Sequence, residues 1–193
     1  MRKTNNEIKR DFLQKWVPKG SKVLDAGCGQ GGDIHKWNSL DVDYTGFDPN
    51  RVAITEARRR AGRLDMKTRF IVGTIRDAPN EKFDVICYNF SFQYQDPDEY
   101  PEIVGRLKSG GILIGIVPDP GRFIEAEKNG IQLFEGSVPG KVGVYISGTP
   151  YYEAGPIEEP VVTCDDVSAR LGLELIEWGD SFSIYSKFVF RSQ

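Results

Sequence analysis

Histidine and cysteine, the side chains most used for zinc binding and nucleophilic catalysis, are scarce in this sequence. The chain of 193 residues has one histidine, His35, and three cysteines, Cys28, Cys87 and Cys164, which lie far apart and form no C-x-x-C pair. This spacing predicts neither a zinc site nor a disulfide framework, and it favours a reducing compartment. We therefore expect no metal site, and we expect His35 to be a partly exposed helix residue rather than a catalyst.

Long apolar runs and an excess of basic residues are also absent. The longest apolar run, ILIGIV at 112–117, is far too short to span a bilayer, and the N-terminal residues lack the apolar core of a signal peptide. The formal net charge of −3 argues against a protein that grips long nucleic acids, because such binding needs many Lys or Arg contacts to phosphate. We expect an intracellular protein, nuclear or cytoplasmic, with no membrane or DNA partner, whereas a short or terminal piece of RNA stays open.

Strand and helix patterns alternate over the first two thirds of the chain. At 39% hydrophobic and 27% charged residues, the composition is that of one ordinary globular domain. Strands are expected at 22–26, 42–47, 68–72, 83–88 and 112–117, and helices at 6–16, 33–40, 50–63 and 101–107. This alternation predicts an α/β fold, a Rossmann-like parallel sheet with helices on both faces. The three arginines at 58–60 are expected to form a solvated helix face.

The alternation stops at Pro118. The stretch to about Pro160 is rich in glycine and proline, and an insertion of that length usually forms a lid or a substrate wall. After it, 164–172 is predicted as a helix, and LELIEW and FSIYSKFVF as two closing strands with an antiparallel edge. The sequence thus predicts a single domain over 1–193, with a mostly parallel seven-stranded sheet and an insertion at about 118–160.

The segment VLDAGCGQGGD, at 23–33, joins the first strand to the next helix. Its Gly27, Gly29 and Gly32 spell the G-x-G-x-x-G of a dinucleotide site. Asp25, however, is expected to place a negative charge there, which repels a pyrophosphate and attracts a sulfonium or ammonium group. Asp48, after the second strand, is placed to accept hydrogen bonds from ribose hydroxyls, as it would for NAD. We therefore predict S-adenosylmethionine rather than NAD, the alternative being a turn that binds no ligand.

These motifs resemble the class I methyltransferases and, more closely, the mRNA cap guanine-N7 methyltransferases, including viral ones. TNNEIK resembles the family's F-N-N-x-I-K, and DAGCGQGGDIHKW resembles D-x-G-C-G-x-G-G-D-x-x-K-W without a gap. FDVICYNFSFQY, LKSGGILIGIVPDPGRF, EEP and FSIY resemble later family motifs, so the resemblance covers nearly the whole chain. It implies a methyltransferase that uses S-adenosylmethionine and acts on the 5' end of capped RNA or a cap-like guanosine nucleotide, with separate capping-enzyme subunits for the earlier steps.

The resemblance also implies two sets of binding residues. The methyl donor is expected to contact Lys9, Asp25, Gly27, Gly29, Asp48, Thr74, Asn89 and Tyr94. The cap is expected to contact Asn5, Asn6, Gln30, Gln93, Tyr94, Glu159 and Tyr185. Of these, Glu159, Tyr94 and Tyr185 are expected to act in catalysis by positioning the guanine and stabilising its charge.

Four positions depart from the family pattern. Gln30 replaces a usual Lys, Gly73 an Asp that meets the adenine, Asn89 a Gln, and Gln93 a His. The loss of Lys and His removes positive charge near the triphosphate and therefore bears on the affinity for the substrate. We expect Thr74 or Asp77 to take over the adenine contact.

Methyl transfer to N7 of guanine needs no general base, because N7 is a neutral lone pair. Holding the reacting atoms in line can supply on the order of 7–11 kcal/mol. The carboxylate of Glu159 and the rings of Tyr94 and Tyr185 are expected to favour the positive charge that develops on the guanine. Two alternatives stay open: a methyltransferase for a small molecule, and a catalytically silent module that binds the cap or the donor.

Overall fold

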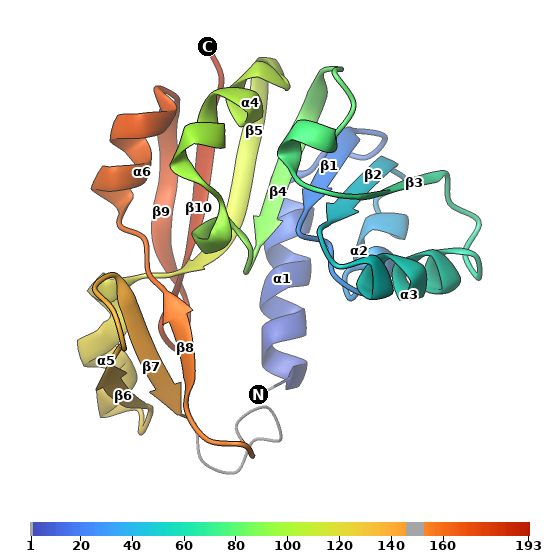
Figure 1. The fold of residues 1–193 in the computed structure, drawn as a ribbon. Helices are drawn as coiled ribbons and strands as arrows, with labels where there is room; N and C mark the ends of the chain where they lie inside the picture. Colours follow the sequence, from blue (N-terminus) through green and yellow to red (C-terminus); the bar gives the residue numbers. More distant parts are fainter. Residues whose placement is uncertain (1, 146–152) are drawn as a thin grey trace.

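A computed structural model of the chain describes residues 2–145 and 153–193 and contains a seven-stranded sheet in the order β3-β2-β1-β4-β5-β10-β9 (Figure 1). The strands are β1 (Lys22–Ala26), β2 (Asp43–Asp48), β3 (Thr68–Val72), β4 (Phe83–Asn89), β5 (Leu107–Pro118), β9 (Glu174–Phe182) and β10 (Tyr185–Arg191). Strands β1 to β5 pair in parallel, and β10 is antiparallel to both β5 and β9. The predicted mostly parallel sheet with an antiparallel closing strand is confirmed.

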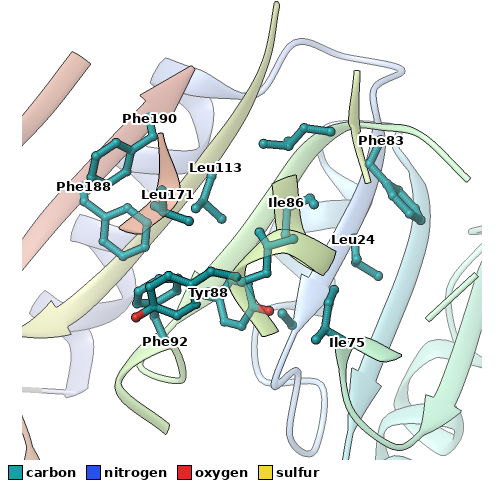
Figure 2. Packing of buried hydrophobic residues seen from close by; sticks show 14 of the residues in the cluster. Leu24, Ile75, Phe83, Ile86, Tyr88, Phe92, Leu113, Leu171, Phe188 and Phe190 are labelled. Atoms are coloured by element: carbon teal, nitrogen blue, oxygen red, sulfur yellow. The ribbon is translucent and has the colours of Figure 1, made fainter. Parts of the chain in front are cut away.

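Helices cover both faces of this sheet. They are α1 (Arg2–Trp16), α2 (Ile34–Asn38), α3 (Arg51–Ala61), α4 (Tyr100–Gly105) and α6 (Cys164–Leu171), with single turns η1 (Ile75–Asp77), η2 (Phe92–Tyr94) and η3 (Pro97–Glu99). One core cluster packs α4 and α6 against the sheet, and Figure 2 shows its aromatic part around Tyr88, Phe92 and Phe188. The other packs α1 and α2 against the opposite face through Leu13 and Trp37. No helix in the described part of the chain has the length and apolarity to cross a membrane.

The ends of the elements follow local chemistry. The Asn50 side chain accepts from the N–H groups of Val52 and Ala53, so α3 begins one residue later than predicted. Strand β5 begins at Leu107 rather than 112, because Leu107 already pairs with Phe83 of β4, before a register shift in this ladder. Gly110, with φ +73°, donates its N–H to the Ser192 carbonyl. The predicted 101–107 helix ends correspondingly early.

The arginines at 58–60 contact residues of their own helix and of the adjacent strand β3. Arg59 and Arg60 form ion pairs with Glu56 on the same helix, and Arg58 donates to the Phe70 carbonyl. This arrangement agrees with the predicted solvated face of α3.

The stretch after Pro118 forms a small sheet of its own. It contains η4 (Pro120–Arg122), α5 (Phe123–Lys128), β6 (Gln132–Glu135), β7 (Lys141–Tyr145) and β8 (Ile157–Pro160), with the strands antiparallel in the order β6-β7-β8. Its buried residues include Ala126, Val142, Val144 and Ile184, the last of which belongs to the β9–β10 turn. In Figure 1 this unit extends from the large sheet at the end toward which β4 points. Whether it acts as a lid or substrate wall, within one domain over 1–193, stays a prediction.

Gly115→Ala is expected to destabilise the fold, because the middle of β5 has no room for a methyl group. A Cβ at Gly115 would overlap the Tyr88 carbonyl oxygen and lie 2.5 Å from Cζ of Phe188. We expect a loss of about 2–3 kcal/mol in the free energy of unfolding, measured by urea denaturation. Gly179→Ala in β9, where a Cβ would meet nothing within 4 Å, is the matched control. Equal stability of the two variants would contradict the packing described here.

Candidate functional site

The carboxyl ends of β1, β2 and β4 meet around the glycine loop at 27–32. A Cβ at Gly27 (φ +68°) would lie 2.5 Å from Cβ of Ser91, whose hydroxyl donates to the Ala26 carbonyl at 2.6 Å. A Cβ at Gly31 (φ +71°) would lie 3.2 Å from Cα of Ala57 in α3, which is also a tight approach. Gly29 (φ +52°), in contrast, has nothing within 4 Å of its missing Cβ. Two glycines therefore serve packing, whereas the backbone at Gly29 lies open to a ligand.

Asp48, at the end of β2, lies beside this open backbone and is half-buried. Its Oδ2 accepts from the Gly29 N–H at 2.9 Å, and its Oδ1 accepts from the Asn50 N–H at 2.8 Å. A carboxylate has about four acceptor positions, so each oxygen can accept one more hydrogen bond. Two adjacent hydroxyls, such as those of a ribose, match this pair of acceptors.

Asn89, at the end of β4, is half-buried, and its Nδ2 and Oδ1 are both buried and lack a hydrogen-bond partner among the described residues. A buried amide without partners is costly, and such a group calls for a ligand. The next residue, Phe90, has a φ of +62°, which is uncommon for a bulky residue. This conformation accompanies an edge-on contact of the Phe90 ring with that of Tyr185, with 4.9 Å between ring centroids, and places the Lys9 ammonium 5.6 Å from the Phe90 centroid.

Asp25 differs from its expected role as an open negative charge. Its residue is 6% exposed, and its Oδ2 accepts from Trp37 Nε1 at 3.0 Å and from the Tyr44 hydroxyl at 2.9 Å. Burial, with a smaller contribution from the charge of Asp33, raises the pKa of Asp25 to about 7. Tyr44 reaches this carboxyl group beneath Gly46, where a Cβ would lie 2.6 Å from the Tyr44 oxygen. Asp25 is therefore a buried residue that supports the loop from below. The expected attraction of a positively charged methyl donor cannot come from Asp25.

A buried ion-pair cluster, which sequence analysis missed, joins α1 to the loop. Asp33 Oδ1 lies 2.7 Å from both Lys9 Nζ and Lys36 Nζ, and Lys36 also donates to Asn6 Oδ1 at 3.1 Å. The side chains of Lys9, Lys36 and Asp33 are only 15%, 8% and 11% exposed. Burial opposes ionisation of Asp33, but the two lysines outweigh it and lower its pKa. The sequence pattern that could have indicated this cluster is the G-G-D-x-x-K-W motif, which contains Asp33 and Lys36.

A second group of candidate residues lies where η2 meets β8. Glu159 is 6% exposed, and its Oε2 accepts from the Tyr94 hydroxyl at 2.9 Å and from Gln93 Nε2 at 3.4 Å. The Oε1 of Gln93 is buried without a partner, and Tyr94 is 62% exposed. The structure thus brings together Gln93, Tyr94 and Glu159, and it links Lys9, Phe90 and Tyr185 through ring contacts.

The remaining candidates lie apart from these contacts or serve local structure. Gln30 is exposed at the loop, and Asn5, whose Oδ1 is buried without a partner, lies near the start of α1. Thr74 caps η1, since its Oγ1 accepts from the Arg76 N–H and its own N–H donates to Asp77 Oδ2. The Asp77 carboxylate fills the space that a side chain at Gly73 would occupy. The sole histidine, His35, is exposed, as predicted.

A hollow of about 500 Å³ lies at the opposite edge of the sheet. It is lined by residues at the amino ends of β1 and β5, including Gly20, Ser21, Ser109 and Gly110. Ligands of open α/β sheets bind outside the carboxyl ends of the strands, so this hollow is not the candidate site.

Comparison with known proteins agrees with this geometry. Residues 23–111 match a family model described as a methyltransferase domain. The chain is 31% identical over 140 residues to an mRNA cap guanine-N(7) methyltransferase of Schizosaccharomyces pombe, an alignment that covers 62% of this chain and 39% of that protein. The chain thus spans about two fifths of the length of the curated relatives it matches.

Solved structures share the fold. A protein from Pyrococcus horikoshii superposes with a TM-score of 0.78 at 20% identity, over 100% of this chain and 91% of that one. An S-adenosylmethionine-dependent methyltransferase from Clostridium acetobutylicum superposes with a TM-score of 0.70 at 16% identity, over 98% and 91% of the two chains. At these identities the likeness shows the fold alone, a Rossmann-like sheet.

The buried Asp25 is expected to make stability fall with rising pH. Since its pKa is about 7 in the folded chain and near 3.8 when unfolded, the folded state keeps a proton that the unfolded state loses. The stability from this group is full below about pH 4 and is lost as the pH rises to about 7. Asp25→Asn, which mimics the protonated acid, should remove roughly 2–3 kcal/mol of the decline in unfolding free energy between about pH 5 and pH 8, measured by urea denaturation. An unchanged difference between the two pH values would contradict the raised pKa.

Proposed function

The chain carries a class I methyltransferase domain and is a relative of the mRNA cap guanine-N(7) methyltransferases, and from this premise we propose that it methylates N7 of the guanosine of an RNA 5' cap. S-adenosylmethionine is the methyl donor in this proposal. The observation that carries the proposal is the pairing of an open glycine backbone and Asp48 on one side with the buried Glu159 on the other.

The donor side fits a nucleoside with a polar tail. Asp48 has an unused acceptor position on each oxygen for the ribose hydroxyls, and Gly29 leaves the backbone uncovered. The unpartnered amide of Asn89 can donate and accept at the same edge of the sheet. Lys9, which forms an ion pair with Asp33 and lies over Phe90, is proposed to donate a further hydrogen bond to the carboxylate of the donor. Asp77, which fills the space beside Gly73, takes the adenine contact, with Thr74 holding it in place.

The acceptor side fits the edge of a guanine. Glu159 is a buried carboxylate that accepts only from neutral donors, Tyr94 and Gln93, in the contacts of the described residues. The N–H groups of a guanine can replace these donors, since Tyr94 is exposed and Gln93 has a second, unpartnered polar atom. The Tyr185 ring, which contacts the Phe90 ring edge-on, provides an aromatic face. Asn5, Asn6 and Gln30 are proposed to contact the phosphates or ribose.

The residues act by position and charge. When bound, S-adenosylmethionine supplies a methyl group on a sulfonium, which leaves as the neutral thioether while N7 forms the new N–C bond. No proton is removed, so the lack of a histidine among the contacts described for the site is compatible with the reaction. Glu159 and the rings of Tyr94 and Tyr185 stabilise the positive charge as it reaches the guanine.

A small-molecule acceptor is the second candidate, and the neutral Gln93 and exposed Gln30 favour it. Neither residue offers a positive charge to a triphosphate. Incubation with labelled donor and either capped RNA, a cap dinucleotide or GTP tests the proposal. Transfer to capped RNA and the cap dinucleotide supports it. Donor binding without transfer to any of them contradicts it and leaves the small-molecule enzyme or a silent binding module.

Asp48→Asn is expected to weaken donor binding. The amide keeps the shape of the side chain but replaces one acceptor oxygen by a donor that faces an N–H group. S-adenosylhomocysteine affinity, measured by calorimetry, should fall about tenfold or more. Asp43→Asn, at the opposite end of β2, is the control and should bind as the wild type does. Wild-type affinity in Asp48→Asn would show that the donor binds elsewhere.

Glu159→Gln is expected to slow methyl transfer while leaving donor affinity unchanged. The amide oxygen still accepts from Tyr94, but the negative charge near the guanine is lost, so kcat on the cap dinucleotide should fall about tenfold or more. Glu158→Gln is the matched control, because Glu158 is the adjacent, exposed residue and contacts only Ser137 and Lys141 in the described interactions. Equal kcat in both variants would contradict a role for the Glu159 charge.

A further inference from the structure

We propose that Asp119 is a positioning residue of the acceptor site: it holds Tyr185 and the root of the 120–160 unit in one geometry. The roles of Tyr185 and Glu159 in binding the acceptor rest on the proposed function. The hydrogen bonds by which Asp119 fixes this part of the chain do not depend on that function.

Asp119 forms hydrogen bonds with both chain neighbours of Tyr185, with the backbone of one and the side chain of the other. Its N–H donates to the Ile184 carbonyl at 2.8 Å, and its Oδ2 accepts from the Ser186 hydroxyl at 2.6 Å. Residues 184 and 186 are the chain neighbours of Tyr185, which itself pairs with Pro118 in the sheet. The position of the Tyr185 ring over Phe90 is therefore set through Asp119.

The same residue holds the start of the 120–160 unit. Asp119 Oδ1 accepts from the Gly121 N–H at 2.8 Å, and its carbonyl accepts from the Arg122 N–H at 2.9 Å, which forms η4. The chain returns beside it, where the Val162 N–H donates to the Pro118 carbonyl at 3.2 Å. Glu159 lies at the end of β8, just before this return. Both ends of the unit that carries Glu159 are thus fixed at residues 118 and 119.

The chemistry of the contacts requires an acceptor with two oxygens. The Asp119 carboxylate receives three neutral donors: Ser186 Oγ, the Gly121 N–H and, at 2.8 Å, Trp178 Nε1. An ionised carboxylate only accepts, so it satisfies all three at once. An asparagine of the same shape turns an N–H₂ group toward at least one of these donors. The Trp178 ring stacks on Phe188, with 6.0 Å between centroids, so the indole N–H is fixed by the core. In the asparagine variant we therefore expect the end of β10, rather than Trp178, to move.

Asp119→Asn tests this role. In the wild type we first measure transfer to the cap dinucleotide and binding of S-adenosylhomocysteine, and then compare the variant. We expect kcat/KM for the acceptor to fall about 10- to 100-fold, the size of a hydrogen bond to a charged group, with donor affinity within about twofold. Hydrogen exchange in peptides covering 183–188 should become about tenfold faster, since the β10 end loses its tie. Ser186→Ala, which removes a single donor, should show a smaller change of the same kind.

Glu102→Gln is the control for a general loss of stability. It removes the ion-pair partner, on α4, of the buried Arg106 that follows this helix, and it should lower the melting temperature without changing acceptor kinetics. Wild-type acceptor kinetics in Asp119→Asn, or an equal loss of donor and acceptor binding, overturns the inference. If the wild type transfers no methyl group to the cap, the proposed function fails, and hydrogen exchange at 183–188 alone decides whether Asp119 holds this strand end.

Discussion

The carboxylate of Asp33 lies between two lysines, and this arrangement fixes the N-terminal helix on the rest of the molecule. Lys36 is three residues along α2, whereas Lys9 comes from α1, so the shared acid joins the first helix to the glycine loop. Removing one partner of a buried ion pair costs about 3–5 kcal/mol, because the remaining charge is left uncompensated. Without this cluster α1 would lose its ion pair to the loop, and both Lys9, proposed for the donor, and Asn5, proposed for the cap, would lose their fixed positions.

The same turn of α2 also carries Trp37, which contacts a second buried acid. Trp37 follows Lys36 and points its indole N–H at Asp25, beneath the loop, where Tyr44 also donates. One turn of α2 therefore serves two acids: Asp33 toward α1 and Asp25 toward the sheet. The motif G-G-D-x-x-K-W is thus a structural unit that holds the loop from both sides, and its residues need not touch a ligand to be required at this spacing.

Sequence patterns predicted the central elements because these depend on local chemistry. Strands β1 and β3 agree to the residue, since a short apolar run followed by glycine or by a turn admits few other structures. The position of Asp48 followed from strand order alone. The orientation of Asp25 did not, because it depends on Gly46, which leaves room for the Tyr44 hydroxyl in a neighbouring strand. Nor do the four glycines among residues 27–32 reveal that Gly27 and Gly31 pack against Ser91 and Ala57 while Gly29 stays open.

The insertion was harder to predict because its structure also depends on contacts between residues that are distant in sequence. Its strands are short, and its contacts are distant in sequence: Tyr94 and Glu159 are separated by 65 residues, and Asp119 and Ser186 by 67. The resemblance to a family indicated Glu159, but only the fold explains how a residue of a small, separate sheet reaches η2. The contact between Glu159 and η2 requires the chain to enter the 120–160 unit and to return from it at the same end of the large sheet. A reaction that removes no proton has few other means of control than such geometry, because its barrier depends on the alignment of three atoms. In the proposed reaction, the residues that fix the two halves of the site are therefore expected to affect the rate, as are those that line it.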